Sequence, residues 1–174
     1  MNRHKRFRLV GVGGTFDVLH EGHKRLLRKA LHVGERVVVG VTSNRFAERM
    51  NKPYEVHSFS TRADGIRRFL QGEKAMRRVD IVQIEDEYGP AATNSQIDAL
   101  VVSRETLQTA REIDKTRRNL GLPPLRLVTI EMVLAEDSKP ISARRIRNQE
   151  ITPTGKIAKE RKRMRRLVSG RPIH

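Results

Sequence analysis

The stretch Val10-Gly-Val-Gly-Gly-Thr-Phe-Asp-Val-Leu-His-Glu-Gly-His23 decides the fold of this chain. Residues 9–12 have the apolar character of a buried strand, and a helix is expected to open near Gly22. Gly13 and Gly14 carry no Cβ atom, so the backbone can turn sharply there and a ligand can approach it closely. A helix start offers unpaired N–H groups and the positive end of a dipole, which together favour a phosphate. The sequence therefore predicts an anion site at this turn.

Two histidines add side chains to the predicted site. His20 and His23 lie three residues apart, so they face the same way on one helical turn and can converge on one anion with the hydroxyl of Thr15. Two alternatives stay open. The spacing also occurs in metal sites, although no acidic or Cys partner lies at a useful distance in the sequence, so no metal ligand is predicted. The turn can also be merely structural.

Length and composition predict one domain in a reducing compartment. A chain of 174 residues can bury a real core, and the absence of Cys excludes disulfides and thiolate metal sites. No apolar run reaches the length of a signal peptide or of a membrane span. We therefore expect a soluble, cytoplasmic protein with no membrane partner.

The net charge of +16 is concentrated at the two ends. Residues 1–8 carry four basic side chains and no acid, and residues 156–174 carry eight against Glu160, which leaves 24 basic and 19 acidic residues in 9–155. We divide the chain into a domain at 1–155 and a basic tail at 156–174, whose residues 156–168 could form a helix with a partial apolar stripe. Basic ends can bind nucleic acid through its phosphates or be solvated tails. With two Tyr, five Phe and no Trp for base stacking, nucleic-acid binding is not the expected main function.

Strand and helix patterns alternate along the domain. Further strands are predicted at 36–41, 79–84, 99–102 and 125–131, and helices at 24–33, 44–50, 60–71 and 105–120. This alternation predicts an α/β fold with an open, mostly parallel five-stranded sheet and helices on both faces. Ligands of such sheets lie outside the carboxyl ends of the strands. The segments that follow strand ends should therefore rim one crevice: Gly13-Gly14, Thr42-Ser43, 86–90 and 103–106.

A second segment rich in site chemistry is Asp137-Ser-Lys-Pro-Ile-Ser-Ala-Arg-Arg-Ile-Arg147. Ser142 is a good N-cap for a short helix, and Arg144, Arg145 and Arg147 crowd its first turns. Cations at a helix start oppose the dipole, so their presence favours a polyanion there, held by N–H groups, a hydroxyl and guanidinium forks. The alternative is a solvated basic helix.

Both segments resemble the signatures of the nucleotidyltransferase superfamily. Gly14-Thr-Phe-Asp17 and His20-Glu-Gly-His23 fill every position of the first, Gly-x-Phe-Asp followed by (His/Thr)-x-Gly-His. The second, Ile-Ser-Ser-Thr-x-x-Arg, holds the β- and γ-phosphates of the nucleotide, and Ile141, Ser142 and Arg147 match it. Ala143 and Arg144 replace its second Ser and its Thr, where backbone N–H groups can still serve. The resemblance implies a Rossmann-like sheet.

Further stretches resemble the archaeal-type phosphopantetheine adenylyltransferases, and the likeness runs from about residue 8 to about residue 155. They are Tyr88-Gly-Pro90, Ala99-Leu-Val-Val-Ser-x-Glu-Thr106, Gly121-Leu-Pro-Pro-Leu125 and Ala135-Glu-Asp137. This resemblance implies transfer of the adenylyl group of ATP to 4′-phosphopantetheine, giving dephospho-coenzyme A and pyrophosphate by in-line attack without a covalent enzyme intermediate. Within the enzyme class, a cytidylyltransferase or an FMN adenylyltransferase is the alternative. An RNA-binding protein on a degenerate nucleotidyltransferase fold is the alternative of another class.

The resemblance also implies roles for individual residues. His23 is expected to hydrogen-bond the α-phosphate with help from His20, while Thr15 orients the attacking phosphate and Lys52 lies near it unless it is a solvated lysine. Asp17 is expected to cap the glycine turn or to help hold Mg²⁺ through water. Mg²⁺ is the expected cofactor because a triphosphate needs charge compensation, yet no protein cage for it is visible. The oligomeric state stays undecided. The expected nucleotide-binding residues are Gly14, Phe16, Asp17, Gly22, Ser103, Glu105, Thr106, Ile141, Ser142 and Arg147.

Overall fold

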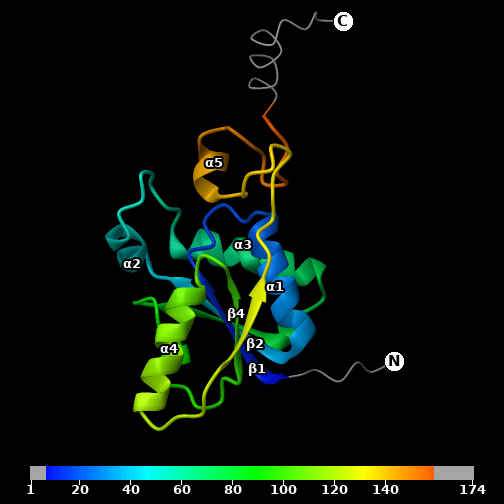
Figure 1. Ribbon diagram of the computed structural model, residues 1–174. Coiled ribbons are helices and arrows are strands. Elements are labelled where there is room, and N and C mark those ends of the chain that lie inside the picture. The colour runs from blue at the N-terminus through cyan, green and yellow to red at the C-terminus, as the bar shows by residue number, and fades with distance from the viewer. Residues whose placement is uncertain (1–6, 159–174) are drawn as a thin grey trace, which may run out of the picture.

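The computed structural model describes residues 7–158, and within them a five-stranded sheet carries helices on both faces (Figure 1). The strands are β1 (Phe7–Gly14), β2 (Gly34–Thr42), β3 (Val79–Ile84), β4 (Ala99–Ser103) and β5 (Arg126–Ile130). The helices are α1 (Glu21–Val33), α2 (Asn44–Arg49), α3 (Phe59–Gly72), α4 (Leu107–Asn119) and α5 (Ala143–Arg147), with 3₁₀ turns η1 (Met76–Arg78) and η2 (Gly89–Ala92).

The strands run in the order β3-β2-β1-β4-β5, and every pairing is parallel. The predicted α/β sheet is confirmed, and it is wholly rather than mostly parallel. The chain builds outward from β1 to β3 on one side and then returns to place β4 against the other edge of β1. This change of direction opens a crevice at the carboxyl ends of β1 and β4, which is where open α/β sheets bind ligands.

Alternate residues of the central strands pack into two separate hydrophobic cores, one on each face of the sheet. Ala99 and Val101 of β4 face the larger core, which packs the sheet against α1 and α3 through residues such as Leu27 and Ile66. Leu100 and Val102 face the smaller core under α4 and η2. Apolar side chains are thus buried on both faces of the strands, as a parallel sheet covered by two helical layers requires.

The sharp turn after β1 lies later than the sequence predicted. Gly13 and Gly14 are the last residues of β1, and the left-handed backbone falls on Phe16 (φ 54°) and Val18 (φ 48°). Of the two glycines, only Gly14 is needed for space. A Cβ on Gly14 would lie 3.2 Å from the Phe16 ring, whereas a Cβ on Gly13 would meet only the Gly40 carbonyl oxygen, at 4.0 Å. A ligand can thus approach the main chain at Gly13.

The segment that follows β5 folds back over the carboxyl edge of the sheet. It has its own small core of Ala135, Ile141 and Ile151, and it carries α5, drawn in orange beyond the start of α1 in Figure 1. The first N–H group of α1, on Glu21, donates to the Pro153 carbonyl at 3.0 Å. The end of the domain therefore lies against the start of the first helix.

The described residues reach only the beginning of the predicted basic tail. Ile157 forms a bridge with Ile151, and the Ala158 N–H donates to the Glu150 carbonyl at 3.1 Å. The rest of the tail, including most of the predicted 156–168 helix, lies outside the described residues. Across residues 7–158, no helix is both long and apolar enough to span a bilayer.

Candidate active site

A cavity of about 710 Å³ lies at the carboxyl ends of β1, β4 and β5 and extends under α5. It brings together segments far apart in the sequence, from the end of β1 to the first residues of α5. Nearly all the residues predicted for the site line it; Arg147 does not. The predicted residues in its wall are Gly14, Thr15, Phe16, Asp17, His20, Gly22, His23, Lys52, Ser103, Glu105, Thr106, Ile141 and Ser142.

His20 and His23 form a stacked pair in this wall. Their ring centroids are 3.8 Å apart with an interplanar angle of 20°, and the Phe16 ring lies 5.1 Å from His23. The Nδ1 atoms of both rings are buried and find no hydrogen-bond partner among residues 7–158. Buried polar atoms left unpaired are costly, so the two rings are held in this wall by packing and not by hydrogen bonds of their Nδ1 atoms.

Both imidazoles are neutral in this setting. Burial lowers the pKa of His20 to about 4, against an opposing effect of Glu21. Burial also holds the pKa of His23 well below its usual value, with His20 and Lys52 adding to the shift. A neutral imidazole donates from one ring nitrogen only, and an anion in the cavity would favour protonation of the other.

Lys52 and Thr15 contact each other in the wall of the same cavity. The ammonium group of Lys52 donates to the Thr15 hydroxyl at 3.1 Å. Burial lowers the pKa of Lys52, with Asp17 opposing and Arg62 reinforcing the shift. The two residues predicted for the acceptor phosphate are therefore neighbours, joined by a bond that an incoming phosphate could replace.

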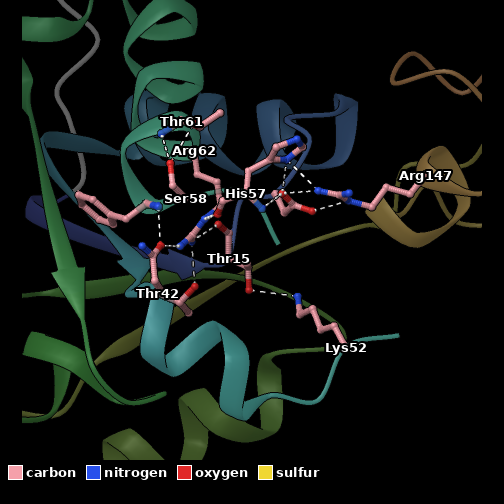
Figure 2. A network of polar contacts seen from close by, with 11 residues as sticks. Thr15, Thr42, Lys52, His57, Ser58, Thr61, Arg62 and Arg147 are labelled. Atoms are coloured by element: carbon pink, nitrogen blue, oxygen red, sulfur yellow. Dashed lines mark hydrogen bonds and ion pairs between the residues drawn. The ribbon is translucent and has the colours of Figure 1, made fainter. Parts of the chain in front are cut away.

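Arg62 joins several segments of the site through hydrogen bonds, and the sequence analysis did not predict this role. Its buried guanidinium donates to the carbonyl oxygens of His57 (2.7 Å) and Thr15 (2.8 Å) and to the Thr42 hydroxyl (3.0 Å), as Figure 2 shows. It thereby fixes the segments that follow β1 and β2 to the start of α3. The arginine lies four residues before Ile66 on the buried stripe of α3, whereas Arg67 and Arg68 are exposed, so its helical spacing was the available signal for its burial.

Asp17 ties the first signature segment to the second. Its carboxylate, 1% exposed, accepts from Arg147 Nε at 2.8 Å, from Arg147 Nη2 at 3.2 Å and from the His57 backbone N–H at 3.1 Å (Figure 2). The His57 Nδ1 atom lies 2.7 Å from the same carboxylate. Burial acts to raise the pKa of Asp17, but the hydrogen bonds from Arg147 and His57 outweigh it and the net shift is downward.

This arrangement places Arg147 beside the cavity rather than in its wall. The guanidinium faces Asp17 and lies over the Tyr54 ring, 5.1 Å from its centroid. A residue predicted to touch nucleotide thus makes its contacts within the protein and holds α5 in position. The partners are 130 positions apart in the chain, so sequence spacing gives no sign of the pair.

The second signature segment forms the cap predicted for it. The Ser142 side chain accepts from the Arg145 N–H at 3.4 Å and begins α5. Residues 130–133, directly after β5, together with Tyr54 and Lys139, also line the cavity and were not predicted. The end of the predicted 125–131 strand was the available signal for the first group, because the carboxyl ends of parallel strands share one edge.

An apolar cavity of about 290 Å³ adjoins the polar one. It lies between β1, β2 and β4 on one side and η2 and α4 on the other, and its wall includes Tyr88, Pro90, Thr109 and Ile113. The two cavities share wall residues at the junction: Gly13, Gly14, Thr15, Met50 and Thr106. One ligand can therefore extend from the apolar cavity to the Thr15–Lys52 pair.

The described part of the chain offers no protein cage for a metal ion. Residues 7–158 hold no cluster of three or more His, Cys, Asp or Glu side chains able to bind one. Asp17, the acid predicted to help hold Mg²⁺, has both carboxylate oxygens engaged by Arg147 and His57. These residues do not fit a dedicated Mg²⁺ site.

Comparison with known proteins agrees with this geometry. A family model described as cytidylyltransferase-like matches residues 12–149. Two proteins named phosphopantetheine adenylyltransferase are close relatives. The one from Methanopyrus kandleri is 47% identical over 144 residues, covering 83% of this chain and 91% of that protein. The one from Methanothermobacter thermautotrophicus is 44% identical over 155 residues, covering 89% and 92%.

Solved structures share the same architecture. A protein of unknown function from Archaeoglobus fulgidus superposes with a TM-score of 0.61 at 36% identity, covering 70% of this chain and 87% of that one. The pantothenate synthetase of Thermus thermophilus superposes with a TM-score of 0.52 at 20% identity, covering 81% and 62%, which shows a common fold alone.

The parallel sheet, the crevice at β1 and β4 and the two signature segments define the class, and the chain belongs to the cytidylyltransferase-like family. Its two relatives place it among the archaeal phosphopantetheine adenylyltransferases. Both levels of the resemblance found in the sequence are confirmed.

Proposed function

We propose that this protein transfers the adenylyl group of ATP to 4′-phosphopantetheine, producing dephospho-coenzyme A and pyrophosphate in coenzyme A biosynthesis. The observation that carries the proposal is the junction of two unlike cavities. A polar cavity holding two unpartnered imidazoles meets an apolar one at Thr15 and Lys52. Such a junction suits a reaction that joins a nucleotide to a phosphate with a long, weakly polar arm.

The chemistry needs no covalent nucleophile from the protein. An oxygen of the 4′-phosphate attacks the α-phosphorus of ATP in line, the new P–O bond forms, and the bond to the bridging oxygen of the β-phosphate breaks. Pyrophosphate leaves with that electron pair. Positioning and neutralisation of charge are then the protein's contributions.

The stacked imidazoles are suited to the α-phosphate. Because His20 and His23 line the cavity and are neutral, each can donate to a phosphate oxygen from one ring nitrogen. Bonds of this kind strengthen as negative charge builds on the oxygens in the transition state. Lys52 and Thr15 would hold the attacking phosphate, exchanging their mutual bond for contacts with it.

The apolar cavity is the proposed site for the pantetheine arm. Its wall is mainly glycine, aliphatic and aromatic residues with four threonines and Glu87, which suits a weakly polar chain, and its junction with the polar cavity would put the arm's phosphate near Lys52. Ser103, Glu105 and Thr106, at the end of β4, line the polar cavity and would contact the base or ribose.

Mg²⁺ is expected to enter with the nucleotide. Mg²⁺ keeps several waters and is commonly held by substrate phosphates with few protein ligands. Turnover should therefore stop on chelation by EDTA and return on addition of Mg²⁺, while the unfolding temperature of the ligand-free protein should not change.

A turnover screen tests the proposal against the other activities of the superfamily. ATP or CTP is offered with phosphopantetheine, phosphocholine, glycerol phosphate or FMN, and pyrophosphate release is measured. We expect turnover with ATP and phosphopantetheine at a kcat/KM far above that of any other pair. Preference for CTP, or for another acceptor, would refute the assignment, and the absence of all turnover would favour the RNA-binding alternative.

A further inference from the structure

Helix α5 carries three arginines, and two of them are neutralised within the protein. The Arg145 guanidinium pairs with Asp137 and Glu150 and donates to the Pro140 carbonyl at 2.8 Å. The Arg147 guanidinium is held by Asp17. Side chains engaged in this way hold α5 and the loop around it in one shape.

Arg144 differs from both of its neighbours. It is exposed and lines the 710 Å³ cavity, and its guanidinium takes part in no ion pair or hydrogen bond found in residues 7–158. The positive charge of Arg144 acts on the Tyr54 phenol in the same wall. Burial raises the pKa of Tyr54, and Arg144 is among the groups that lower it. The guanidinium is thus available on the cavity side of α5, with Lys139 in the same wall.

The sequence at this point departs from the second signature. Ala143 and Arg144 stand where the pattern has Ser and Thr, so two neutral hydroxyl donors are missing and one cation has been added. A guanidinium presents a planar fork of charged donors that matches phosphate oxygens, and its hydrogen bonds are stronger than those of a hydroxyl. The substitution exchanges one means of binding phosphate for another.

We propose that Arg144 binds the departing pyrophosphate end of ATP and replaces the hydroxyl contacts that the second signature would supply. The inference rests on the proposed function. If the imidazole pair holds the α-phosphate of ATP while Thr15 and Lys52 hold the attacking phosphate at the end of β1, the rest of the triphosphate extends toward the wall made by α5. Arg144 is the arginine of α5 that is free to meet it.

The test compares binding of ATP and AMP by calorimetry, without acceptor, in wild type, Arg144→Gln and Arg144→Lys. AMP lacks the β- and γ-phosphates, so it reports contacts made elsewhere in the site. Arg111→Gln is the matched control, because it removes the same charge from an exposed position on α4 outside both cavities. Since Arg144 makes no internal bond, its variants should unfold at the wild-type temperature.

We expect Arg144→Gln to raise the Kd of ATP about tenfold or more, as loss of a charge-assisted hydrogen bond does, and to leave the Kd of AMP within about twofold. Arg144→Lys should bind ATP more tightly than Arg144→Gln, and Arg111→Gln should match wild type. An unchanged Kd for ATP, or equal losses for ATP and AMP, would overturn the inference. The turnover screen on wild type reports separately on the proposed function.

Discussion

At the scale of single residues, the candidate site contains two imidazoles that burial keeps uncharged. His20 and His23 stack on each other, and their Nδ1 atoms lack partners in the described chain. Protonating either one in the empty cavity would place a charge against its neighbour in a poorly solvated space. Two predictions follow from this pair, one on stability and one on turnover.

The first concerns acid stability. The pKa of His20 is about 4 in the folded protein and near 6.5 when unfolded, so between these values only the unfolded chain takes up the proton. The free energy of unfolding should therefore fall as the pH is lowered from about 6.5 to about 4, by about 3 kcal/mol from this residue. Above pH 6.5 the contribution is constant.

Urea unfolding at a series of pH values measures the effect, with His20→Asn as the comparison. The variant lacks the titrating ring, so its stability should decline less steeply across this window than that of wild type. Parallel curves for the two proteins would show that His20 titrates normally in the folded state.

The second prediction concerns turnover. His23→Ala should lower kcat about a hundredfold or more, because removing one donor aimed at developing charge costs roughly 2.7–4 kcal/mol of barrier. His32→Asn, on the same helix but outside both cavities, should keep wild-type turnover. Circular dichroism should show the fold intact in both. A His23→Ala enzyme with near-normal kcat would remove His23 from the mechanism.

Sequence reasoning found the residues whose neighbours lie close in the chain. The spacing of His20 and His23 predicted that they face the same way, and the structure stacks them. The pairing of Asp17 with Arg147 and the bond from Arg62 to the Thr15 carbonyl were not predicted, because both join segments more than 40 residues apart. A local pattern carries no information on such pairs.

At the scale of elements, the Asp17–Arg147 ion pair joins the turn after β1 to α5. Asp17 is almost fully buried, so removal of its charge leaves Arg147 and His57 facing a neutral group. We expect Asp17→Asn to lower the free energy of unfolding by about 3 kcal/mol, within the range for breaking a buried pair. Thermal or urea unfolding measures it.

A double-mutant cycle separates this pair from its surroundings. Asp17→Asn combined with Arg147→Gln should cost less than the sum of the single changes, by roughly 0.5–3 kcal/mol, because the second change removes an already unpaired charge. Strict additivity would mean that the two groups do not stabilise each other.

The elements themselves were largely predictable. All five strands and the four helices before β5 lie where the sequence patterns placed them: buried apolar runs for the strands, apolar stripes for α1, α3 and α4, and N-cap residues for α2. The exception is the bend after β1, which falls on Phe16 and Val18 instead of the glycines. The arginine and carbonyl contacts that hold this loop over-determine its backbone, and a residue-by-residue preference cannot foresee that.

At the scale of the whole molecule, the two helical layers give the site two unlike compartments. Under the proposed function, the apolar cavity receives the pantetheine arm. Narrowing this cavity should therefore weaken binding of phosphopantetheine and leave binding of ATP unchanged. We expect Thr109→Phe, which fills the wall on α4, to raise the KM for phosphopantetheine tenfold or more, comparable to a loss of roughly 1–3 kcal/mol of pocket contacts.

The Kd of ATP should stay within about twofold in Thr109→Phe, because Thr109 does not line the polar cavity. Gln108→Phe puts the same ring on the exposed side of α4 and serves as the control. Equal losses for both substrates would mean that the ring disturbs the sheet edge, and an unchanged KM would exclude the apolar compartment as the binding place of the arm.

The bond from the Glu21 N–H to the Pro153 carbonyl has a consequence for the protein's synthesis. The imidazoles are translated early, whereas the carbonyl that caps their helix, and the arginine that secures the neighbouring turn, leave the ribosome more than a hundred residues later. A nascent chain that holds the sheet but lacks this last stretch has an incomplete wall around the 710 Å³ cavity, the proposed site for ATP. Capture of ribosome-bound chains on immobilised ATP should therefore begin only when about residue 153 has emerged.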